Sequence, residues 1–101
     1  MAETTLNLNA LDSESRESRT HVILTANSAS AIPDGEYIYF KAVFTDSKGT
    51  VICKRTITDN EGNAVKLTAI DQMVVLDYNF ITIEPVYYGS SMPNDLKVYQ
   101  F

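Results

Sequence analysis

The sequence predicts an all-β protein, an antiparallel β-sandwich of about seven strands. Apolar and polar residues alternate with a period of two in several stretches, as they do in strands with one buried face. Turn-forming runs such as Pro33-Asp34-Gly35 and Asp46-Ser47-Lys48-Gly49 separate these stretches. The strands recur at roughly 8–12-residue spacing, and no stretch requires a helix. We favour a sandwich over a barrel because the predicted strands are short.

The N-terminal part contains two predicted strands joined by a polar segment. Residues 4–10 alternate between apolar and polar side chains and form the first strand. Residues 11–19 are rich in serine and mixed in charge, so we interpret 1–19 as a first strand plus a polar loop or linker. A short helix is the alternative for this segment. Residues 20–26 form the second strand, and its inward side consists of Val22, Leu24 and Ala26.

Residues 34–52 contain the clearest hairpin, a strand that turns tightly into the next strand. Period-two alternation divides the first strand of this hairpin into two faces. The predicted core face consists of Ile38, Phe40, Ala42 and Phe44. The predicted half-exposed face consists of Tyr37, Tyr39, Lys41 and Val43.

The C-terminal part supplies the remaining strands. Residues 50–58 are rich in β-branched side chains, residues 64–70 alternate, and residues 96–101 close the chain. Residues 73–88 are long for one strand, so we expect a bulge or turn near 77–80. Pro85 cannot donate to a strand ladder, which predicts that this strand lies at a sheet edge or leaves the sheet there. The predicted core residues are Leu24, Ile38, Phe40, Phe44, Leu67, Ile81 and Ile83.

Length, charge and cysteine content limit the classes of function. A chain of 101 residues has room for one core, so we expect residues 1–101 to form a single domain. The net charge of −5 argues against nucleic acid or an anionic membrane surface as a partner. No apolar run approaches the ~18 residues of a membrane span, and the sequence shows no signal peptide. Cys53 is the only cysteine, so we expect no internal disulfide and a small, partly buried Cys53 side chain.

Several motifs resemble those of bacterial immunoglobulin-like domains of the invasin and intimin type. The resemblance covers roughly residues 20–101. It rests on the strand His21–Ala26, the turn Ala31–Gly35, the run Ala42–Val51, the turn and strand Thr58–Thr68 and the segment Asn79–Gly89. It implies an immunoglobulin-like sandwich that serves as a non-catalytic structural or adhesion module of a bacterial surface or phage-tail protein. It also implies an extracellular location, with neighbouring domains or a host-surface protein or glycan as partners.

Tyrosines form the candidate binding site. Tyr37, Tyr39 and Lys41 share the predicted half-exposed face, and Tyr87, Tyr88 and Tyr99 lie near the C-terminal strands. An exposed tyrosine surface can stack on sugar or bind a protein partner. The alternative is ordinary cross-strand packing, or contact with a neighbouring domain.

The other polar residues do not indicate an enzyme, a cofactor or a metal site. The only histidine, His21, lies on the exposed side of its predicted strand. Turn formation explains the acidic loop residues Asp34, Asp46, Asp59 and Glu61. We therefore expect no catalysis. Because the first and last strands can be open sheet edges, homodimerisation by edge pairing is a further expectation.

Overall fold

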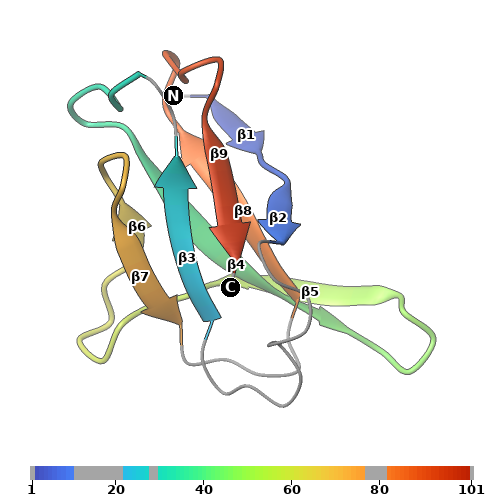
Figure 1. The fold of residues 1–101 in the computed structure, drawn as a ribbon. Helices are drawn as coiled ribbons and strands as arrows, with labels where there is room; N and C mark the ends of the chain where they lie inside the picture. The colour runs from blue at the N-terminus through green and yellow to red at the C-terminus, as the bar shows by residue number, and fades with distance from the viewer. Residues whose placement is uncertain (1, 11–21, 28–29, 77–81, 101) are drawn as a thin grey trace.

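The computed structural model describes residues 2–10, 22–27, 30–76 and 82–100, with the backbone alone at 10, 22–25, 27 and 100 (Figure 1). Over these ranges the chain forms strands and no helix, which confirms the all-β prediction. The strands are β1 (Glu3–Thr5), β2 (Leu8–Ala10), β3 (Val22–Asn27), β4 (Tyr37–Thr45), β5 (Val51–Thr56), β6 (Lys66–Leu67), β7 (Met73–Leu76), β8 (Thr82–Tyr88) and β9 (Lys97–Gln100).

The strands form two sheets. Sheet A has the order β1-β8-β4-β5, and β6 pairs with β4 on the same side as β5. Sheet B has the order β2-β9-β3-β7. Neighbouring strands are antiparallel, except that β2 runs parallel to β9.

Two of the predicted strands are each divided between the sheets. The predicted strand 4–10 forms β1 in sheet A and then β2 in sheet B. The predicted strand 73–88 likewise forms β7 in sheet B and β8 in sheet A. The described ranges therefore contain more strands than predicted. The expected bulge near 77–80 lies outside the described residues, as do Tyr78 and Ile81.

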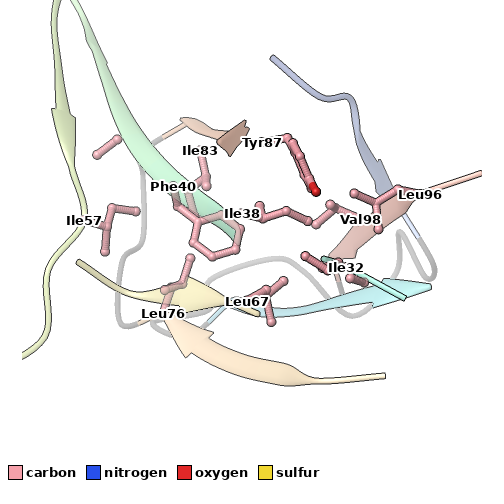
Figure 2. Packing of buried hydrophobic residues seen from close by; sticks show 12 residues of the cluster. Ile32, Ile38, Phe40, Ile57, Leu67, Leu76, Ile83, Tyr87, Leu96 and Val98 are labelled. Carbon is pink, nitrogen blue, oxygen red and sulfur yellow. The ribbon is translucent and has the colours of Figure 1, made fainter. Parts of the chain in front are cut away.

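One cluster of buried side chains receives residues from both sheets (Figure 2). Ile38, Phe40 and Ile83 come from sheet A, and Leu76 and Val98 come from sheet B. The predicted core residues Ile38, Phe40, Leu67 and Ile83 are confirmed as buried. The side chain of Leu24 is not described.

Phe44 is only half-buried, so the prediction that it lies in the core holds only in part. It packs at the margin of the cluster. The pairing of β4 with β8 ends at Val43 and Thr82, one residue before Phe44. Phe44 pairs instead with Cys53 of β5, a strand whose six residues are all exposed. The expectation of a partly buried Cys53 is therefore wrong.

Two tight turns share one geometry. The Asp46 Oδ1 accepts backbone hydrogen bonds from Lys48 and Thr50 at 2.9 and 3.0 Å. The Asp59 Oδ1 accepts the equivalent bonds from Glu61 and Asn63 at the same distances. The glycine in each turn has a φ of 86°, which favours a residue without a Cβ. The prediction that turn formation explains Asp46 and Asp59 is confirmed.

Pro85 lies inside β8, which is an inner strand between β1 and β4. The prediction that this strand lies at an edge or leaves the sheet there is wrong. Pro85 pairs with Phe40, whose carbonyl accepts the N–H of Ile57 on the side away from β8. Pro85 and Phe40 are therefore a non-hydrogen-bonded pair, and the missing N–H of Pro85 faces β1. The Leu6 N–H donates to the Pro85 carbonyl on that side at 2.9 Å, so the β4–β8 ladder loses no hydrogen bond at Pro85.

The sheet edges differ from those expected. The first strands β1 and β2 are edges, as predicted. The last strand β9 is an inner strand between β2 and β3, so its predicted open edge is wrong. The opposite edges belong to β5 in sheet A and β7 in sheet B.

Candidate functional site

Strand register brings most of the predicted site residues together on the outer side of sheet A. Tyr37, Tyr39 and Lys41 alternate along β4, and Tyr88 of β8 lies opposite Tyr37. We call these four residues the tyrosine face. All four are half-buried. The prediction that Tyr37, Tyr39 and Lys41 share one partly exposed face is therefore consistent with the register.

The rings of the tyrosine face contact one another. Tyr37 and Tyr88 stack with their centroids 4.9 Å apart and their planes inclined by 23°. The Tyr39 ring lies 6.2 Å from the Tyr37 ring in a tilted arrangement. The Lys66 Nζ lies 4.2 Å from the Tyr37 centroid, a cation–π distance. Much of the aromatic surface is thus already in contact with other side chains of the same chain.

The hydroxyl of Tyr39 is also engaged. It donates a hydrogen bond of 2.9 Å to the Glu3 Oε2 on β1. Burial, together with the hydrogen bond to Glu3 and the negative charge of Glu3, raises the pKa of Tyr39 to about 12. The Tyr39 phenol is therefore a donor at neutral pH, and it connects β1 to β4 across β8.

A salt bridge closes the other end of this surface. The Lys54 Nζ of β5 lies 2.8 Å from the Glu84 Oε2 of β8. These strands lie on opposite sides of β4, so the Lys54 side chain crosses β4 at Val43, its partner in register. This crossing accounts for the burial of Val43, which lies on the predicted half-exposed face but is covered there.

Tyr87 does not belong to the tyrosine face, and its predicted place on an exposed binding surface is wrong. Its side chain is fully buried and points into the core (Figure 2). Its neighbour Tyr88 faces outward because successive strand residues point to opposite faces. The same alternation predicts Tyr87 to point inward with Ile83, and that assignment is confirmed. Tyr99 lies on β9 in sheet B, away from the tyrosine face.

Tyr87 forms a buried polar cluster with Glu36, a residue that sequence reasoning missed. The Tyr87 hydroxyl donates a 2.6 Å hydrogen bond to the Glu36 Oε1, which also accepts the backbone N–H of Ser91 at 3.2 Å. Burial raises the pKa of Tyr87, and the bond to Glu36 and its charge raise it further. A Cβ at Gly89 would overlap the Glu36 carboxylate. Glu36 precedes Ile38 by two residues, so the period that identified the core face also placed Glu36 inward.

We searched the part of the chain that the structure describes for a metal-binding group and for a membrane-spanning helix. It contains no group of three or more His, Cys, Asp or Glu side chains placed to hold a metal ion. No helix in those ranges is long and apolar enough to cross a membrane. His21 lies outside the described residues.

Comparisons with known protein families, with curated proteins and with solved structures find no match to this chain.

Proposed function

We propose that this chain is a non-catalytic, immunoglobulin-like β-sandwich module that serves as a structural spacer or adhesion domain of a bacterial surface or phage-tail protein. The observation that carries the proposal is the contact network of the tyrosine face. Its rings and the hydroxyl of Tyr39 contact neighbouring side chains of the chain itself. A surface whose rings and hydroxyl group already contact other side chains of the same chain is better suited to a stable scaffold than to a preformed ligand site.

The shared core supports the sandwich part of the proposal. Side chains from both sheets meet in one buried cluster, the arrangement expected where two sheets pack face to face. The pairs β3–β7 and β4–β8 correspond to central pairs of an immunoglobulin domain. An immunoglobulin domain also pairs its first strand with its second and its last with its penultimate strand. Here β1 pairs with β8 and β9 with β3, so the proposed module is an immunoglobulin-like variant with exchanged terminal strands.

The spacer role predicts a fixed distance between whatever the module joins. We would place the chain between two fluorescent proteins and measure energy transfer in single molecules. A rigid spacer gives one narrow distribution, and the core variant Phe40→Ala gives a broader, more extended one. A wild-type distribution as broad as that of the variant would contradict the spacer role.

A binding module for carbohydrate or protein is the second candidate. The stacked pair of Tyr37 and Tyr88 is half-buried rather than covered, and Lys66 lies beside it. A partly exposed aromatic pair can still stack on a sugar ring or contact a protein.

A glycan array followed by NMR shift mapping tests the binding candidate. Tyr88→Ala should abolish any binding that uses the tyrosine face. Tyr99→Ala, which removes a half-buried tyrosine from the other sheet, is the matched control. Binding lost equally in both variants, or in neither, would exclude the tyrosine face as the binding surface.

A further inference from the structure

The first described segment of the chain, residues 2–10, forms an edge of both sheets, and we call it the strap. Residues 3–5 pair with β8 in sheet A, and residues 8–10 pair with β9 in sheet B. Each ladder is three residues long, and only Leu6 and Asn7 join the two. The strap therefore covers one side of two inner strands with two short ladders.

The strap contributes little to the core. Within residues 2–9 no side chain is buried, and the apolar Leu6 and Leu8 are half-buried at the margin of the core cluster. A cavity of about 360 Å³ is lined by the strap on one side and by residues that include Met92 and Val98 on the other. Segments with few buried apolar contacts open at a lower cost in free energy than the core does.

Polar contacts at the surface hold the strap in place. The Glu3 Oε2 accepts the hydrogen bond from the Tyr39 hydroxyl, and the Asn9 Nδ2 donates to the Val98 carbonyl oxygen at 3.2 Å. The first of these bonds anchors β1 to sheet A, and the second anchors β2 to sheet B. A hydrogen bond that water can replace contributes little net stability, so these anchors are weak compared with the buried core.

We propose that the strap detaches from both sheets as one unit while the rest of the described fold stays intact. Two residues separate its ladders, so the release of one ladder removes the support of the other. In the open state β8 and β9 are free on the side that faced the strap, and the Tyr39 hydroxyl loses its bond to Glu3. For the binding candidate the strap is thus a cover over one polar group of the tyrosine face. This consequence rests on the binding function proposed above, whereas the detachment itself does not.

The alternating backbone of β8 makes the detachment measurable. The Gly89 N–H donates to the Ala2 carbonyl oxygen of the strap at 2.9 Å. Because hydrogen-bonded pairs alternate along an antiparallel ladder, the Tyr87 N–H faces the strap as well. The N–H groups of Val86 and Tyr88 face β4 instead. Opening of the strap therefore exposes every second amide of this strand and leaves the others bonded.

Hydrogen exchange of the full chain, followed by NMR at increasing urea concentration, tests the proposal. The amides of Tyr87 and Gly89 should exchange with a weak urea dependence, because opening of the strap exposes little surface. The amides of Val86 and Tyr88 should exchange only by global unfolding, about tenfold more slowly or less. Equal rates and equal urea dependence for the two sets would overturn the proposal. The experiment needs no ligand, so its result is independent of whether the tyrosine face binds one.

Two substitutions test whether the strap opens as one unit. Asn9→Ala removes a bond between β2 and β9, and it should speed exchange of the β8 amides that face β1 by about threefold or more. Glu3→Ala, which removes the bond from β1 to Tyr39, should have the same effect. The exposed turn substitutions Asn60→Ala and Glu61→Ala are the matched controls and should leave these rates unchanged. If Asn9→Ala left the β8 amides at their wild-type rates, β1 and β2 would open separately and the proposal would fail.

Discussion

At the scale of single residues, Glu36 is a buried acidic residue, with 8% of its surface exposed. Burying a charge is costly unless hydrogen bonds compensate for the lost water. The Tyr87 hydroxyl and the Ser91 N–H supply two such bonds to one oxygen. The hydrogen bonds of Glu36 therefore join the residue just before β4 to the end of β8 and the loop that follows it. Gly89 leaves the space that the carboxylate occupies.

The two hydrogen-bonded tyrosines predict an alkaline transition. The pKa of Tyr39 rises from 10.0 to about 12 on folding, and that of Tyr87 also rises. A raised pKa means that the protonated phenol stabilises the fold. This contribution is complete below pH 10 and is lost as the pH rises through the folded pKa. Tyrosinate absorbance should therefore show late-ionising groups, and stability should fall above pH 10.

The variant Tyr39→Phe isolates one of these groups. It should remove a single ionisation near pH 12 from the absorbance titration while the remaining late step persists. Tyr99→Phe is the control, because Tyr99 lies in the other sheet. A titration in which Tyr39→Phe removes a group that ionises near pH 10 would contradict the Glu3 contact.

At the scale of elements, β8 is the inner strand on which sheet A depends. It pairs with β1 on one side and with β4 on the other. A proline is tolerated in it because its missing N–H faces the β1 side and not β4, so the β4–β8 ladder is unaffected. The N–H of the next residue, Val86, faces β4, because hydrogen-bonded and non-hydrogen-bonded pairs alternate along the ladder.

Two substitutions in β8 should therefore differ in their effect. Pro85→Val keeps the β4–β8 ladder and should change the free energy of unfolding by about 1 kcal/mol or less. Val86→Pro removes an N–H that faces Tyr39 and leaves its acceptor unpaired, which should cost about 1–3 kcal/mol. Urea denaturation of both variants measures the difference. Equal losses would show that the register assigned to Pro85 is wrong.

Sequence patterns predicted the local features and missed those that depend on the partner strand. The period of two placed Ile38, Phe40 and Ile83 inward, and the repeated Asp-x-x-Gly run identified both tight turns. The same period is compatible with either sheet, so it could not show that residues 4–10 change sheets. Cys53 is exposed because it lies on β5, an edge strand whose six residues are all exposed, and no local pattern shows that this strand is an edge.

The candidate site was predictable to a similar extent. Residues two apart on one strand share a face, so Tyr37, Tyr39 and Lys41 were grouped correctly. Whether their rings are open or engaged depends on the residues that the register places opposite them. Tyr88 and Lys66 come from strands distant in sequence, and their contacts with Tyr37 could be known only from the fold.

At the scale of the whole molecule, both sheets depend on one core. Phe40 lies near the middle of β4 and is fully buried in the cluster shared by the sheets. Loss of its ring should therefore destabilise both sheets together rather than one alone.

The variant Phe40→Ala should lower the free energy of unfolding by about 3–5 kcal/mol. Thermal melting followed by NMR signals from β3 and from β8 should show one coincident, earlier transition. The exposed substitution Thr82→Ala on β8 is the control and should melt like wild type. Unchanged melting of Phe40→Ala would show that Phe40 is not central to the core.

The parallel pairing of β2 with β9 has a consequence for tension applied to the chain. Three residues of β2 pair with β9, and the Asn9 Nδ2 donates to the Val98 carbonyl oxygen at 3.2 Å. Once a pulling force has detached β1 from the sheet, the force acts on the start of β2 and on the end of β9. Because these strands run in the same direction, the force slides them along each other and loads their hydrogen bonds together. A chain stretched between two anchoring points would therefore resist by shear between β2 and β9.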